Sequence, residues 1–207
     1  MLLKQIKAYI KYLLNKCSYV KGKNNHITQK GIRINTVIHI KGNNNTILFE
    51  DMSRLTDCKI GIAGSNNEII IKRQSDIERA ALLIGGNNSK IIIGSHTHIG
   101  ASHLAVTEDN QLLTIGDDCM ISDEVQFRTG DSHSILDENG NRTNSAQSIT
   151  IGNHVWIGEG CKVLKGVTIG ENSIVATGAI VTKSFGNNLL LGGVPAKVLK
   201  DRVNWNS

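Results

Sequence analysis

The stretch "ITIGNHVWIGEGCKVLKGVTIGENSIVATGAIVTKSFG" at residues 149–186 places an aliphatic residue at every sixth position. A period of six fits neither an α-helix nor an alternating strand, because each would turn successive apolar side chains to different faces. It fits a solenoid in which three short strands make one triangular turn of about 18 residues. Every sixth side chain then points inward, and we predict an all-β solenoid from the positions Ile151, Ile157, Val163, Ile169, Val175 and Val181.

A second repeat lies upstream and has the form aliphatic-x-Gly-x-Asn-Asn. It starts at Val20, Ile40, Ile62 and Ile84, at intervals of 20, 22 and 22 residues. Glycine and asparagine tolerate left-handed backbone conformations, so we expect them where each coil bends. The repeat predicts irregular coils of the same solenoid with corner residues Asn24, Asn44, Asn66 and Asn87.

These patterns divide one elongated domain into successive segments. We predict an amino-terminal helix over 1–17, irregular coils over 18–92 and regular hexapeptide coils over 93–186, followed by a cap over 187–207. The regular coils are interrupted by "SILDENGNRTNSAQS", and a polar loop this long in a tightly wound solenoid is typical of a functional segment. We therefore predict an active-site loop over residues 134–148.

Helices are expected at both ends of the solenoid. Residues 1–17 place Leu3, Ile6 and Ile10 toward one side and lysines elsewhere, which predicts a basic amphipathic helix. Such a helix packs on its own subunit or a neighbour, or makes a peripheral contact with an anionic membrane. At the other end, Pro195 can begin a short capping helix over "AKVLKDRV".

Composition narrows the class of protein. Aromatic residues make up only 4% of the chain, which suits a solenoid packed with stacked aliphatic side chains. The formal charge of +5 comes without an arginine-rich run interleaved with aromatics, so we expect no nucleic-acid partner. Cys119 and Cys161 fall at inward positions, as buried thiols of a reducing compartment do. We predict a cytoplasmic protein, with the inner membrane surface as the alternative set by the amino-terminal helix.

From Ile151 to Lys200 the chain resembles the hexapeptide-repeat acetyltransferases, especially the sugar and capsular polysaccharide (sialic acid) O-acetyltransferases. The motifs "VWIG", "GAIVTK" and "GGVPAKV" carry this resemblance. It implies a left-handed parallel β-helix, a homotrimer, acetyl-CoA as co-substrate and no metal. It also implies a carbohydrate acceptor, namely a sugar hydroxyl of a bacterial-type surface polysaccharide such as a capsule or O-antigen, with sialic acid as one candidate.

His133, in "RTGDSHSI" at the edge of the polar loop, is the candidate general base. A neutral imidazole has suitable basicity near pH 7, and the family resemblance places a catalytic histidine at the start of such a loop. Asp131 would orient His133, bind substrate or cap a turn, because a carboxylate at an inward position needs partners. Ser132 and His103 are candidate substrate-binding residues.

Trp156 is the second catalytic candidate, because an exposed indole is unusual in a chain so poor in aromatic residues. The resemblance places this ring at the acceptor and thioester end of the site, whereas packing between subunits is the structural alternative. Carrying the family's acetyl-CoA positions onto matching residues implies cofactor-binding roles for Trp156, Glu159, Thr177, Thr182, Lys183, Lys197 and Lys200.

Other functions remain open from sequence. An amino-sugar N-acetyltransferase shares the fold and co-substrate. A γ-class carbonic anhydrase also uses this solenoid and holds zinc with three histidines, for which His98, His103 and His133 would be the candidates, with His96 nearby. A β-helix without activity is a third reading, which the retained loop and "VWIG" disfavour.

Overall fold

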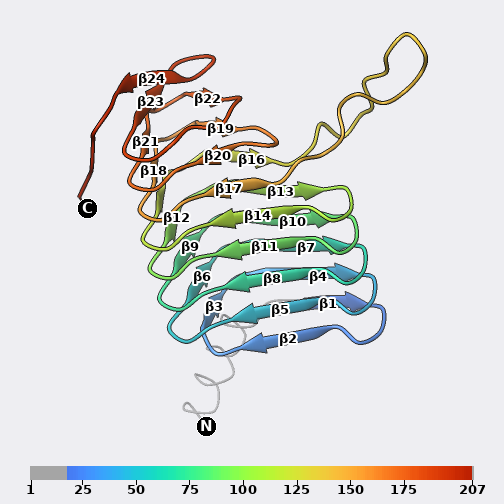
Figure 1. Ribbon diagram of the computed structural model, residues 1–207. Coiled ribbons are helices and arrows are strands. Elements are labelled where there is room, and N and C mark those ends of the chain that lie inside the picture. Colours follow the sequence, from blue (N-terminus) through green and yellow to red (C-terminus); the bar gives the residue numbers. More distant parts are fainter. Residues whose placement is uncertain (1–17, 207) are drawn as a thin grey trace.

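The computed structural model describes residues 18–206, and over that range the chain winds into a left-handed triangular prism of three parallel sheets (Figure 1). Sheet A contains β1 Ser18–Lys21, β4 Val37–Lys41, β7 Lys59–Ala63, β10 Ala81–Gly85, β13 His103–Thr107, β16 Gln126–Arg128, β19 Lys162–Val163 and β22 Ile180–Val181. Sheet B contains β2 His26–Gln29, β5 Thr46–Phe49, β8 Glu68–Ile71, β11 Lys90–Ile93, β14 Leu112–Ile115, β17 Ile149–Ile151 and β20 Thr168–Ile169. Sheet C contains β3 Ile32–Ile34, β6 Arg54–Thr56, β9 Asp76–Glu78, β12 His98–Ile99, β15 Met120–Ile121, β18 Trp156–Ile157, β21 Ile174–Val175, β23 Leu190–Gly192 and β24 Lys197–Lys200.

Coils near the amino terminus are longer than those near the carboxyl terminus. Ile60 lies beside Leu82 in sheet A, whereas Val163 lies beside Val181. The number of residues in one coil therefore falls from 22 to 18 along the chain. The long coils make a wider turn between sheets A and B, where Gly64 has φ +140° and Asn66 has φ +59°. The sequence therefore predicted the bends of the long coils, whose length reflects the Gly-x-Asn-Asn turn.

An asparagine ladder runs along this A–B corner. Each amide Nδ2 donates to the Oδ1 of the next coil, at 3.2 Å from Asn24 to Asn44, 3.1 Å from Asn44 to Asn66 and 3.2 Å from Asn66 to Asn88. The fourth left-handed residue is Asn88, with φ +54°, and not the predicted Asn87. In the repeat "IGGNNSKI" the sixth position is Ser89, where the other repeats have Asn, and Asn87 precedes the aligned asparagine, so the prediction fell one residue early.

The core is a stack of inward aliphatic side chains. The side chains at the sixfold positions are at most 1% exposed, among them Ile157, Val163 and Val175. Burying one such side chain stabilises the fold by roughly 1.5–3 kcal/mol, so the repeated stack holds the corners of successive coils in line. Side chains at the corners and outer faces are therefore attached to a rigid frame.

The two predicted end helices have different outcomes. The helix over residues 1–17 lies outside the described residues. The carboxyl-terminal helix is wrong: residues 197–200 form strand β24, which pairs antiparallel with β23. The last strand of sheet C would otherwise leave backbone N–H and C=O groups unpaired, and β24 satisfies them. Across residues 18–206 no helix is long and apolar enough to span a membrane.

One long loop leaves the prism at the A–B corner between β16 and β17 and projects well beyond the coils (Figure 1). At its base the N–H of Gln147 donates to the carbonyl of Thr129 at 2.8 Å. Its outer part folds as a short hairpin, with an antiparallel bridge between Leu136 and Arg142. The predicted loop, residues 134–148, thus lies outside the solenoid, and its residues are exposed except for Asn144 and Ala146.

Candidate active site

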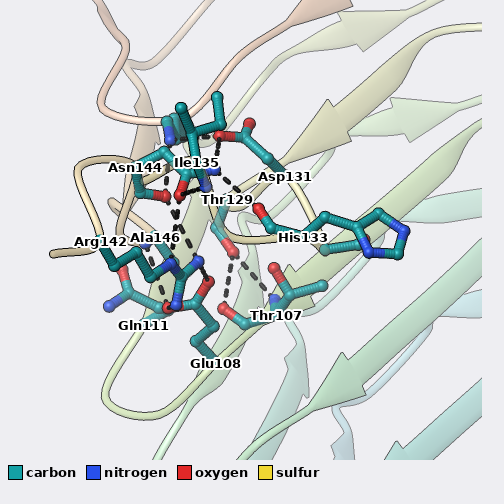
Figure 2. A network of polar contacts seen from close by, with 12 residues as sticks. Thr107, Glu108, Gln111, Thr129, Asp131, His133, Ile135, Arg142, Asn144 and Ala146 are labelled. Carbon is teal, nitrogen blue, oxygen red and sulfur yellow. Dashed lines mark hydrogen bonds and ion pairs between the residues drawn. The ribbon is translucent and has the colours of Figure 1, made fainter. Parts of the chain in front are cut away.

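The root of the loop is held by the side chain of Asn144, which is only 6% exposed. Its Nδ2 donates to Asp131 Oδ2 and to the backbone carbonyl of His133, each at 2.8 Å, and its Oδ1 accepts the N–H of Ile135 at 2.7 Å (Figure 2). A buried amide that satisfies three partners costs free energy to displace. Asn144 therefore sets the position of the His133 backbone.

Asp131 is hydrogen-bonded to Asn144 and Lys165 and not to the His133 ring. Its Oδ2 accepts hydrogen bonds from Lys165 Nζ and Asn144 Nδ2, and Lys165 also donates to the Asn144 carbonyl at 2.9 Å. The ammonium of Lys165, followed by the Asn144 amide, lowers the pKa of Asp131. Asp131 is thus connected to His133 through the backbone.

A second ion pair ties the returning limb of the loop to the prism. The Arg142 guanidinium forms a two-point contact with the Glu108 carboxylate, and Glu108 also accepts the N–H of Ala146 at 3.3 Å (Figure 2). The hydrogen bond from Arg142 is the main reason that the pKa of Glu108 is lowered. Bidentate pairs of this kind restrict orientation as well as distance.

The His133 ring is exposed and points away from the polar network (Figure 2). It borders a hollow of about 380 Å³, here called the loop hollow, lined by Arg128, Gly130, Asp131, Ser132, His133, Leu164 and Lys165. An imidazole in this position can exchange a proton with a group in the hollow, beside two cationic side chains. The loop hollow thus contains three of the predicted residues: Asp131, Ser132 and His133.

Ser132 adopts a left-handed backbone conformation, with φ +67°, between Asp131 and His133. Its Oγ accepts a hydrogen bond from Arg128 Nη2 at 2.7 Å. A non-glycine residue in this region is uncommon, and here it turns the chain sharply where the loop departs from the prism. Arg128 therefore holds the turn that directs His133 outward.

His103 lies outside the loop hollow. It is on β13 and lines a separate hollow of about 480 Å³ over sheet A, together with Arg79, Gln126 and Lys162 among others. Burial lowers the pKa of His103, and the positive charges of Arg128 and Lys59 lower it further. Arg128 lies between the two hollows, because it borders the loop hollow and acts electrostatically on His103.

The predicted acetyl-CoA residues fall into two groups. Thr182 and Lys183 follow β22 and so lie at the same A–B corner as His133. Trp156 lies on sheet C, 38% exposed, and Lys197 and Lys200 lie on the edge strand β24 of that sheet. In a triangular prism, the A–B corner is opposite sheet C. One copy of the chain therefore does not bring these two groups together.

Glu159 and Thr177 lie with the second group, at the corner where sheet C leads into sheet A. Both side chains are exposed, and the Glu159 carbonyl accepts the N–H of Gly178 at 2.8 Å, which holds successive coils in register. Gly158, Gly160 and Gly178 flank these two residues in sequence, so this corner has few bulky side chains.

Within one copy of the chain, the histidines of the metal alternative do not converge. His98 is on β12 in sheet C, His103 is on β13 in sheet A, and His133 is on the loop. His96, at the corner before β12, is bonded to Gln74 at 2.7 Å and paired with Asp118 at 3.3 Å. Among residues 18–206, no group of three or more His, Cys, Asp or Glu side chains could hold a metal ion.

Sequence reasoning missed Asn144, Arg128, Lys165 and Trp205. Polar residues in a loop and lysines in a hexapeptide coil are common, so nothing marked the first three. Trp205 had a signal, since it is one of only two tryptophans in the chain. It lies 6.1 Å from Trp156 between ring centroids.

Comparison with known proteins identifies relatives that share the hexapeptide repeat and the solenoid fold. The family described as "Bacterial transferase hexapeptide (six repeats)" matches residues 148–183. The galactoside O-acetyltransferase of Escherichia coli K12 is 41% identical over 88 residues, which is 42% of each chain. The polysialic acid O-acetyltransferase of Escherichia coli O1:K1 is 36% identical over 91 residues, or 44% of this chain and 30% of that protein. The chain thus spans less than half the length of these curated relatives.

Two solved structures match over nearly the whole chain. The polySia-specific acetyltransferase NeuO has a TM-score of 0.83 and 29% identity, covering 92% of this chain and 88% of that one. The polysialic acid O-acetyltransferase OatWY has a TM-score of 0.84 and 28% identity, covering 93% and 92%. The chain is therefore a left-handed β-helix protein with hexapeptide repeats, similar in sequence and fold to the bacterial sugar O-acetyltransferases.

Proposed function

We propose that this chain transfers an acetyl group from acetyl-CoA to a sugar hydroxyl of a surface polysaccharide, with polysialic acid as the first candidate acceptor. The observation that carries the proposal is the nearly full-length similarity to two acetyltransferases whose names specify that polymer. The exposed His133 ring beside the loop hollow supplies a suitable base. The formal charge of +5 suits an acidic glycan.

The proposed reaction is a direct transfer. The unprotonated nitrogen of His133 removes the proton of the sugar hydroxyl, and the resulting oxygen attacks the thioester carbonyl carbon. The carbon–sulfur bond then breaks, and the imidazolium returns its proton to the departing thiolate of coenzyme A. Asn144 and Arg128 hold the turn that carries His133, which keeps the base in a fixed position as the reaction requires.

Acetyl-CoA would bind between two copies of the chain. His133, Thr182 and Lys183 lie at the corner opposite the sheet that carries Trp156, so one binding site needs a corner from one copy and sheet C from the next. A contact between two different surfaces of identical chains closes into a ring when the rotation between copies is a whole fraction of a turn, which is one third for a trimer. We propose a homotrimer, in which Lys197 and Lys200 offer charge to the adenosine phosphates and Glu159 and Thr177 line the pantetheine arm.

Transfer is tested by following thiol release from acetyl-CoA with oligosialic acid, galactosides and nucleotide sugars as acceptors. His133→Ala should lower turnover by at least about 100-fold, the low end for removal of a general base. His26→Ala, an exposed histidine on β2 at the other end of the prism, is the control and should retain activity. An equal rate for His133→Ala and the control would remove His133 from the mechanism.

The product separates O-acetylation from the amino-sugar alternative. A sugar ester is cleaved by alkaline hydroxylamine, whereas an N-acetyl amide survives the same treatment. We expect release of the transferred acetyl group. A resistant product would assign the chain to amino-sugar N-acetylation instead.

A further inference from the structure

Both tryptophans of the chain meet on the outside of sheet C, although they lie far apart in sequence. The Trp156 and Trp205 rings are 6.1 Å apart between centroids at an interplanar angle of 48°. Trp205 also stacks on His154, at 4.4 Å and 11°, and its indole N–H donates to the His154 carbonyl at 2.8 Å. The position of Trp205 is therefore fixed by two ring contacts and a hydrogen bond.

The chain after β24 returns to reach this place. Figure 1 shows it running back alongside the prism from β24. The N–H of Val203 donates to the carbonyl of Asn188 at 3.0 Å, and Trp205 then contacts His154, which lies two residues before the start of β18. The pairing of β24 with β23 already covers the edge of sheet C. The return of the tail instead places an aromatic ring beside Trp156.

Trp205 forms one wall of a hollow of about 440 Å³, here called the indole hollow, within the range of roughly 300–1,000 Å³ usual for small-molecule sites. Its other walls combine hydrogen-bonding side chains with apolar surface. They include His96, His98, Asp118, Met120 and His154. His96 is bonded to Gln74 and paired with Asp118, so this polar wall is ordered without a ligand.

We propose that the indole hollow binds one sugar ring of the acceptor polysaccharide, beside the ring that is acetylated. This inference rests on the proposed function. A sugar ring has an apolar C–H face, which suits an indole, and a rim of hydroxyls, which suits imidazoles and a carboxylate that together donate and accept hydrogen bonds. The carboxylate of Asp118 disfavours an anionic group here, so the hollow takes the hydroxyl-bearing part of the ring.

The indole hollow lies next to Trp156, so it can influence which acceptor sugars the protein binds. Met120 lines the hollow and lies beside Trp156 in the register of sheet C. A polymer occupying both places would cross from the indole hollow to the Trp156 surface. Occupancy of the hollow therefore favours a chain of several sugars over a single sugar.

The kinetic test varies oligosialic acid at saturating acetyl-CoA, and then varies acetyl-CoA at saturating acceptor. Trp205→Ala should raise the acceptor KM by about 10-fold, the size of one aromatic contact, with the acetyl-CoA KM unchanged. Trp205→Phe should recover most of the affinity. The control is Arg202→Ala on the same tail, where the side chain is 92% exposed. Unchanged acceptor KM in Trp205→Ala, or an equal rise in both KM values, overturns the inference and leaves the transferase proposal standing.

A binding measurement separates this inference from the chemistry. Saturation-transfer NMR on His133→Ala protein with oligosialic acid should show signals that disappear in the His133→Ala, Trp205→Ala double variant. His98→Ala, combined with His133→Ala, should weaken the same signals, because His98 also lines the hollow. Signals that persist without Trp205, or no signal from oligosialic acid at all, contradict a sugar site in the hollow even if transfer is confirmed.

Discussion

Asn144 shows how one buried side chain positions an exposed one. Its amide bonds the Asp131 carboxylate and the His133 carbonyl at the same time, so the loop root and the ion pair with Lys165 form one unit. His133 could be proposed from sequence because its motif resembles that of a family. Asn144 could not be proposed, because its importance comes from being buried within an otherwise polar loop.

The cysteines of the solenoid test the prediction that certain side chains point inward. The structure confirms this prediction for Cys119 and Cys161, whose side chains are buried. Burial raises the pKa of Cys58 and Cys119 to about 11 and also raises that of Cys161. Since the thiolate is the reactive form, Cys17→Ser protein at pH 8 should not react with a disulfide reagent until denatured, when three thiols are titrated. Rapid reaction of the folded variant would contradict this burial.

At the scale of the coil, the glycines of the A–B corner have unequal roles. Gly86 has φ +154°, and a Cβ at that position would lie 2.2 Å from the carbonyl oxygen of Glu108. Gly85 has open space around its missing Cβ. The neighbouring pair thus separates a steric requirement of the stacked coils from the general flexibility of glycine.

Gly86→Ala should lower the free energy of unfolding by about 3 kcal/mol, because neither backbone can move without breaking the stack. Gly85→Ala should change it by less than about 0.5 kcal/mol, since that side chain enters solvent. Urea unfolding followed by circular dichroism compares the two variants. Equal midpoints would mean that the corner can relax around an added methyl group.

At the scale of the whole molecule, the proposed active site is divided between opposite sides of the prism. His133 lies at the A–B corner and Trp156 lies on sheet C, so each proposed site takes one residue from each of two copies. Two inactive variants should then repair each other. A copy with intact His133 can complete a site with a neighbour that has intact Trp156.

Co-expressed His133→Ala and Trp156→Ala chains should recover about one third of the wild-type activity in mixed trimers, because a ring of three that contains both variants has one intact site out of three. Each variant alone should have little activity, and a chain carrying both substitutions is the matched control. The measurement is thiol release by the mixed assembly after purification through two different tags. No recovery would place His133 and Trp156 in the same copy or remove one of them from the site.

The sequence by itself determined the solenoid, its inward residues, the bends of the long coils and the position of the polar loop. These features follow from periodicity within one or two coils, where neighbouring residues decide which side chains point inward. Tertiary structure decided which outer residues share a face. That outcome depends on coil lengths of 22 and 18 residues, on hydrogen bonds across coils, and on a tail that returns to place Trp205 against Trp156. The cap formed β24 in place of the predicted helix for the same reason, because an unpaired strand edge offered partners that local propensity does not reveal.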